Sequence, residues 1–188
     1  MYHRDEINSI KSCLKEHQQT LSVAESVTSG HLQAALSLAD GATDFYQGGI
    51  TTYNLGQKSK HLNVDPIHAL SSNCVSEVVS EQMALNALKL FSSDWAIATT
   101  GYAAPIPELM IDKLFVIFSI AFRDEIVMTK TIHAPGQKSP LETQVFYANI
   151  ILKEFKAILQ NQKRTKDKLH RAPMLKKNHK SQKTNNKS

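Results

Sequence analysis

Residues 20–31 read TLSVAESVTSGH, and this stretch decides the fold that we expect. Its first five residues form a short apolar strand. Small hydroxyl residues and one glycine follow, and then Leu32, Ala35 and Leu36 recur at helical spacing. The pattern predicts a tight turn from a strand into a helix that begins near Gly30. Such a turn lies at the end of a sheet and presents side chains and backbone N–H groups to a ligand.

The serine in the middle of this turn, Ser26, has two interpretations. Serine, threonine and glycine are the preferred residues at helix N-caps, so the turn is consistent with an ordinary cap. A serine at the end of a strand can also be a nucleophile or an anion ligand. The local pattern does not decide between these interpretations.

Helical and strand patterns alternate along the chain. Val78, Met83 and Ala87 share one face of a long helix that Ser76 caps. Ser139, Pro140 and Glu142 have the spacing of a capping box at the start of the last helix. The expected helices are 4–18, 30–39, 58–62, 77–91 and 140–160, and the expected strands are 20–25, 48–53, 95–100, 114–122 and 125–132. This order predicts a three-layer α/β/α domain with a mixed, mostly parallel sheet of about five strands.

Charge divides the chain into two parts. The formal net charge is +5, but residues 161–188 carry +9 and residues 1–160 carry −4. We therefore predict a folded domain over 1–160 and a basic, disordered tail over 161–188. The tail is consistent with a solvated segment or with electrostatic contact to nucleic acid.

No apolar run approaches the ~20 residues that span a bilayer, so we expect no membrane segment. The polar start of the chain has no apolar signal-peptide core, and this predicts a cytoplasmic protein. The two cysteines form neither a disulfide framework nor a metal set. The eight histidines show no metal-ligand spacing, and neither a Walker loop nor a G-x-G-x-x-G motif is present, so we expect no metal and no cofactor.

Reactive side chains follow the ends of three predicted strands. Ligands bind beyond the C-terminal ends of parallel strands. Ser26 follows the first strand, Tyr53 and Lys58 follow the second, and Thr100 begins a loop after the third. A desolvated lysine can take a proton from serine, and a tyrosine can relay the proton or hold the geometry. We therefore predict a site in which Ser26, Tyr53 and Lys58 meet.

Four segments, in this order, resemble motifs of the CinA C-terminal domain family. Residues 24–30, AESVTSG, resemble A-E-S-C-T-G-G, and Thr52-Tyr53 followed by Lys58 resembles T-Y-S-N-x-x-K. Residues 73–76, NCVS, are similar to G-A-V-S, and residues 100–105, TGYAAP, are similar to T-G-I-A-G-P. The resemblance spans about residues 5–160.

This resemblance implies an α/β/α domain with a five-stranded mixed sheet, assembled as a homo-oligomer. It also implies nicotinamide-nucleotide amidohydrolase activity, which converts nicotinamide mononucleotide (NMN) to nicotinic acid mononucleotide and ammonia without a metal. The catalytic residues would be Ser26, Tyr53 and Lys58. The substrate-binding residues would be Thr28, Ser29, Gly30, Thr100, Gly101, Ala103 and Lys138.

The chain departs from the family pattern where the substrate phosphate would bind. The loop A-G-P-x-G-G is replaced by residues 103–108, AAPIPE. Of the cations in G-x-R-x-x-(V/I)-R only Lys138 remains, and Glu142 replaces the second arginine. A carboxylate there would repel a phosphate.

Three functions are consistent with the sequence. The first is an amide C–N hydrolase that acts on NMN or a related small amide. The second is a degenerate member of the family that binds a nucleotide-like ligand or a protein partner without turnover. The third is association with nucleic acid through the basic tail.

Overall fold

One mixed sheet runs through the protein. The computed structural model describes residues 1–136 and 139–177, with side chains described as far as residue 162. The strands are β1 (Leu21–Glu25), β2 (Tyr46–Thr51), β3 (Trp95–Tyr102), β4 (Phe115–Phe122) and β5 (Glu125–His133). Their order in the sheet is β2-β1-β3-β4-β5. The pairings show that β4 runs against its two neighbours while the other strands share one direction. The predicted mixed, mostly parallel sheet is therefore confirmed.

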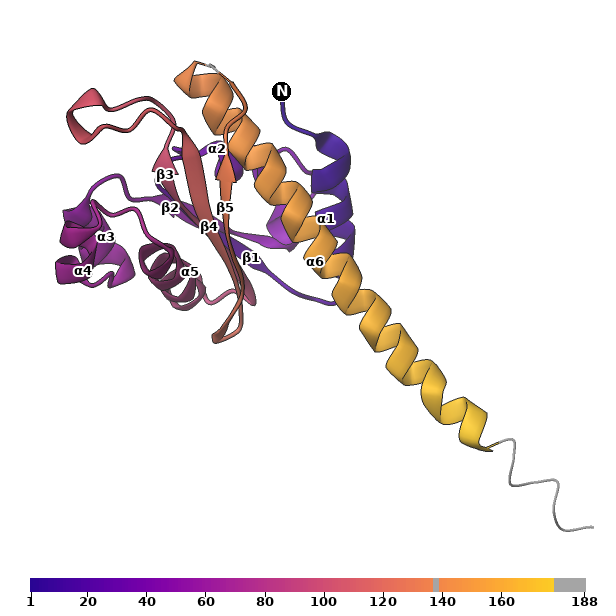
Figure 1. Ribbon diagram of the computed structural model, residues 1–188. Coiled ribbons are helices and arrows are strands. Elements are labelled where there is room, and N and C mark those ends of the chain that lie inside the picture. The colour runs from indigo at the N-terminus through magenta and orange to yellow at the C-terminus, as the bar shows by residue number, and fades with distance from the viewer. Residues whose placement is uncertain (137–138, 178–188) are drawn as a thin grey trace, which may run out of the picture.

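Helices cover both faces of this sheet (Figure 1). One face carries α1 (Arg4–Glu16), α2 (His31–Ser37) and α6 (Pro140–Lys177). The other face carries α3 (Leu55–Leu62), α4 (Pro66–Ser71) and α5 (Glu77–Phe91). Two short 3₁₀ turns, Ala42–Asp44 and Pro107–Leu109, complete the elements. The three-layer α/β/α architecture that the sequence predicted is confirmed.

The two faces of the sheet hold cores of different bulk. Side chains alternate along each strand, so successive residues enter opposite layers. In β3, Trp95 and Ile97 enter the layer of α1, α2 and α6, whereas Ala96 and Ala98 enter the layer of α5. Small residues on the α5 side let that helix pack close to the sheet.

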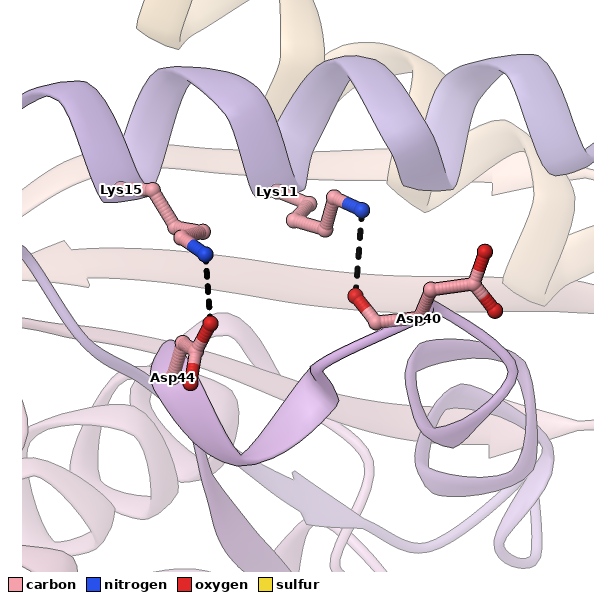
Figure 2. A network of polar contacts seen from close by, with 4 residues as sticks. All are labelled: Lys11, Lys15, Asp40 and Asp44. Atoms are coloured by element: carbon pink, nitrogen blue, oxygen red, sulfur yellow. Dashed lines mark hydrogen bonds and ion pairs between the residues drawn. The ribbon is translucent and has the colours of Figure 1, made fainter.

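Polar contacts tie α1 to the segment between α2 and β2 (Figure 2). Lys15 forms an ion pair with Asp44, and Lys11 donates to the backbone oxygen of Asp40 over 3.0 Å. Exposed contacts of this kind add little stability. Their role is geometric, since they hold the chain where it enters β2.

Several boundaries differ from the sequence-based expectation. The sequence did not predict α4. The Asp65 side chain accepts from the Ile67 N–H and caps this helix, and Pro66 occupies its first turn. Residues that were interpreted as the end of the preceding helix therefore start a new one. β2 begins at Tyr46, two residues earlier than expected, and β3 continues to Tyr102.

The last helix extends beyond its expected end near residue 160. Leu159 is the last buried residue among those whose side chains are described, and α6 continues to Lys177 and projects past the sheet in Figure 1. The apolar pattern predicts only the part that packs on the core. The division at residue 160 stays a prediction, and residues 178–188 of the predicted tail lie outside the described residues.

Gly101 is a packing requirement of the sheet. A Cβ at this position would lie 2.2 Å from the backbone oxygen of Phe115, and its φ is +146°. We expect Gly101→Ala to lower the free energy of unfolding by about 3 kcal/mol or more, because backbone must move. Gly56→Ala is the control, since its Cβ would meet only ordinary contacts. Urea unfolding of both variants measures the difference, and equal stabilities would contradict this account.

Candidate functional site

Glu25 shapes the turn after β1. Its side chain is fully buried and accepts four hydrogen bonds. The donors are the Thr28 hydroxyl at 2.6 Å and the N–H groups of Gly30 at 3.1 Å, Leu32 at 3.1 Å and Gln33 at 2.9 Å. The N-cap residue of α2 is Gly30, which makes no side-chain cap. The carboxylate of Glu25 therefore satisfies the helix end that the hydroxyl residues were predicted to cap.

A chain of hydroxyl groups links this carboxylate to β3. The Thr28 proton goes to Glu25, so the Thr99 hydroxyl, 2.8 Å from the Thr28 hydroxyl, donates to it. The Thr99 oxygen in turn accepts from the Ser26 N–H over 3.3 Å. These contacts fix the backbone on both sides of Ser26.

Lys58 reaches Ser26 from the next strand end. The ladder between β1 and β2 continues by one bond, from the Thr52 N–H to the Glu25 oxygen at 2.8 Å. The Thr52 oxygen accepts from the Lys58 Nζ at 2.7 Å, and Nζ lies 2.8 Å from the Ser26 Oγ. Asn54 caps α3, the helix that carries Lys58. The structure therefore joins two of the three predicted catalytic side chains.

Burial determines the protonation of this lysine. Lys58 is 1% exposed, and no carboxylate lies among its hydrogen-bond partners in the described part of the chain. Desolvation lowers the pKa of the Lys58 amine from 10.5 to about 8, while the nearby Cys74 thiol acts in the opposite direction. About a tenth of the amine is therefore neutral at pH 7, and this neutral form can accept a proton from Ser26.

A cleft of about 570 Å³ opens in front of this pair. Ends of β1 and β3, the segments around α3 and α4, and the start of α6 form its walls. Lys58 is the only lysine, arginine, aspartate or glutamate among the described lining residues. These residues are Ser26, Val27, Tyr53, Asn54, Leu55, Lys58, Ala69, Leu70, Asn73, Cys74, Val75, Thr100, Gly101, Tyr102, Ala103, Ala104, Ile106, Pro140 and Gln144.

Tyr53, the third predicted catalytic residue, lies at the rim of the cleft. Its side chain is 73% exposed, and within residues 1–136 and 139–162 it makes no hydrogen bond to Ser26 or Lys58. Its participation in chemistry stays a prediction, and it would require the side chain to close over a bound substrate.

The predicted substrate-binding residues separate into three groups. Thr100, Gly101 and Ala103 line the cleft. Thr28 is buried. The Ser29 N–H already donates to the backbone oxygen of Ser26, and the Gly30 N–H already donates to the Glu25 carboxylate. Lys138 lies outside the described residues.

Glu142 has a structural role. Its carboxylate accepts from the Ser139 N–H at 2.9 Å and from the Ser139 hydroxyl at 2.7 Å. The Ser139 Oγ accepts from the Glu142 N–H at 3.3 Å, so the predicted capping box is confirmed. From this helix, the described residues that face the cleft are Pro140 and Gln144. The expected repulsion of a phosphate by Glu142 therefore has no basis in the cleft lining.

Four residues of the site were missed by sequence reasoning. Glu25 and Thr99 hold the turn, and Asn73 and Tyr102 line the cleft. Glu25, Asn73 and Tyr102 lie inside the motifs quoted above, but none of them had a predicted role of its own. Their own contribution depends on long-range contacts that spacing along the chain does not reveal.

Fold and site together define a class of protein: a three-layer α/β/α domain with a buried serine–lysine pair at the C-terminal edge of its sheet. The chain belongs to the CinA C-terminal domain family, whose model matches residues 4–154.

Relatives and solved structures agree with this assignment. A CinA-like protein of Picosynechococcus sp. is 42% identical over 96 residues, which are 51% of this chain and 23% of that protein. One of Mycolicibacterium gilvum is 36% identical over 124 residues, 64% of this chain and 29% of that protein. The chain thus spans about a quarter of the length of these relatives. The crystal structure of a competence-damaged protein (CinA) superfamily protein from Klebsiella pneumoniae has a TM-score of 0.76 and 25% identity, covering 84% of this chain and 97% of that one.

The Glu25 network leads to a prediction about stability. Glu25→Gln keeps the size of the side chain but places an NH₂ group against N–H and O–H donors. We expect it to lower the free energy of unfolding by about 3 kcal/mol, because bonds to a charged acceptor are lost in a buried site. Glu77→Gln, at an exposed position, is the control. Thermal unfolding checks the prediction, and similar midpoints for the two variants would refute the role of Glu25.

Proposed function

We propose that this domain is an amide C–N hydrolase that uses Ser26 as nucleophile and Lys58 as base, with NMN as the substrate to test first. The observation that carries the proposal is the 2.8 Å contact between the Lys58 Nζ and the Ser26 Oγ, in a buried position at the wall of a cleft. Membership of the CinA family supports the proposal, although the relatives are named only as CinA-like proteins.

The first half of the reaction forms an ester. Neutral Lys58 accepts the Ser26 proton while Oγ bonds to the carboxamide carbon. The C–N bond then breaks, and the leaving nitrogen takes the proton from the Lys58 ammonium and departs as ammonia. The Thr52 oxygen holds the Lys58 Nζ in place through both proton transfers.

The second half hydrolyses the ester. A water molecule attacks the acyl carbon as Lys58 takes its proton. The bond to Oγ breaks, the proton returns to Ser26, and the carboxylic acid product leaves. One lysine thus acts as base and acid in turn, which suits a pKa of about 8.

Backbone N–H groups of the turn would stabilise the negative oxygen of the intermediate. Within the described part of the chain, the N–H groups of Val27 and Thr28 donate to no protein acceptor, in contrast to those of Ser29 and Gly30. Val27 also lines the cleft. We assign the oxyanion site to these two donors, with Thr100, Gly101 and Ala103 in contact with the substrate.

Ammonia release from NMN by the purified protein tests the proposal. We expect the wild type to form nicotinic acid mononucleotide and one ammonia per product. Tyr53→Phe should lose about tenfold or more in rate, because its hydroxyl is proposed to assist proton transfer. Binding of NMN without any product would support the degenerate-member interpretation and contradict ours.

A cytoplasmic location, assembly into a homo-oligomer and nucleic-acid contact through the tail stay predictions. None of the described helices is long and apolar enough to cross a membrane.

A further inference from the structure

The Thr99 hydroxyl joins the turn after β1 to β3 at a point where the two strands no longer pair. The pairing of β1 with β3 ends at Ala24 and Ala98, and its pairing with β2 ends at Glu25. Ser26 lies beyond both ends, and its N–H donates to the Thr99 Oγ1 over 3.3 Å. A side-chain oxygen of β3 therefore anchors the proposed nucleophile to the sheet.

The same hydroxyl holds a second residue of the turn. It donates to the Thr28 Oγ1 over 2.8 Å, because the Thr28 proton goes to the Glu25 carboxylate. Thr28 and Val27 carry the two N–H groups that we assign to the oxyanion site. One hydroxyl of β3 therefore contacts both the residue that carries the nucleophile and a residue that carries an oxyanion donor.

Thr99 belongs to the interior of the sheet and not to the cleft. It is 0% exposed, and β4 pairs with β3 opposite it, at Phe118. It is absent from the described residues that line the cleft. Its effect on a reaction would therefore pass through the turn. A central strand is a precise support for such a contact, since productive geometry must be held within about 0.5 Å.

From these contacts we infer that Thr99 is a positioning residue that sets the distance between the Ser26 nucleophile and the oxyanion donors. This inference rests on the proposed function and adds a residue that acts without touching the substrate. Loss of the hydroxyl would deprive the Ser26 N–H of its acceptor and the Thr28 Oγ1 of a donor in a buried place. The turn would then have to shift to satisfy them, and the two halves of the site would no longer be in register.

Thr99→Val keeps the shape of the side chain and removes the hydroxyl. With NMN, we expect kcat to fall by about 10–100-fold through misplacement of the nucleophile. KM should stay within about threefold of the wild type, because the cleft lining is unchanged. The rise of kcat/KM with pH should keep its midpoint at about 8, because Thr52 and not Thr99 holds Lys58. Thr99→Ser keeps the hydroxyl and should retain more than about a third of kcat.

Thr129→Val is the matched control. The Thr129 hydroxyl, on β5, also bonds within the domain, to Ser119 at 3.0 Å and to Glu81 at 2.8 Å. Thr129 lies outside the described cleft lining. This variant loses a comparable set of hydrogen bonds, so it reports the effect of destabilisation alone. At a temperature where all variants are folded, its kcat should equal that of the wild type.

A covalent probe tests the inference without NMN. In the reaction with a fluorophosphonate ester, the Ser26 Oγ bonds to phosphorus, fluoride leaves and Lys58 takes the Ser26 proton. The phosphoryl oxygen of the probe occupies the oxyanion site, so the rate depends on both halves of the site. Mass spectrometry of the intact protein follows the labelling. Thr99→Val should be labelled at least about tenfold more slowly than the wild type, and Thr129→Val at the wild-type rate.

The inference is overturned if Thr99→Val is labelled as fast as the wild type, if Thr99→Ser loses as much as Thr99→Val, or if the loss with NMN appears in KM instead of kcat. Absence of labelling at Ser26 in the wild type would overturn it together with the role of Ser26. Failure of the proposed function alone has a different signature. The wild type would then be labelled at Ser26 but would release no ammonia from NMN, and the labelling rates would still decide the role of Thr99.

Discussion

Ser26→Ala is expected to reduce the rate of ammonia release from NMN by on the order of 10³-fold or more, because Ser26 supplies the oxygen that forms the acyl bond. Alanine removes only a hydroxyl whose partner is Lys58, so the fold should persist. The initial rate at saturating substrate, measured by coupled detection of ammonia, gives the loss.

The matched control for this change is Ser37→Ala. Ser37 is exposed on α2, the helix that follows the turn, and its hydroxyl donates only to the backbone oxygen of Ala34. Its rate should equal that of the wild type. If Ser26→Ala retains more than about a tenth of the activity, Ser26 is not the nucleophile.

Lys58→Met should reduce the rate by about 10²–10⁴-fold, the range for loss of a general base. In the wild type, kcat/KM should rise with pH and level off above about 8, because only the neutral amine accepts the Ser26 proton. Lys60→Met, at an exposed position on the same helix, should leave both rate and pH profile unchanged. A wild-type profile that is flat between pH 6 and 9 would contradict the assignment of Lys58.

The same group makes stability depend on pH. The pKa of Lys58 is lower in the folded chain, about 8, than its ordinary value of 10.5. Below pH 8 folding must bury an ammonium group, and between pH 8 and 10.5 the unfolded chain binds more protons than the folded one. Stability of the wild type relative to Lys58→Met should therefore rise by about 3 kcal/mol across this interval. Urea unfolding at several pH values measures the difference, and a constant difference would show that burial does not affect the amine.

The sequence contained enough information for the layers and for the centre of the site. Alternation of strand and helix patterns predicted the sheet, and the apolar periods predicted which helices pack on it. Ser26 and Lys58 each follow a predicted strand, and neighbouring parallel strands end at one edge. Their proximity therefore followed from topology.

Other features depend on contacts that no local pattern encodes. The four bonds of Glu25 and the hydroxyl chain through Thr99 join residues from separate segments, so neither residue had a visible role. The signals at Asp65 and Pro66 fit the end of one helix as well as the start of another. The Tyr53 side chain is exposed because it lies at the rim of the cleft. The five-residue spacing between Tyr53 and Lys58 does not reveal this position.

The most direct test of the central claim is to trap the ester on Ser26 during turnover of NMN with hydroxylamine. An acyl-enzyme transfers its acyl group to hydroxylamine as well as to water, so the wild type should form the hydroxamate of nicotinic acid mononucleotide in proportion to the hydroxylamine present. Neither Ser26→Ala nor Lys58→Met should form it at a comparable rate. Ammonia release by the wild type without any hydroxamate would contradict a covalent mechanism at Ser26.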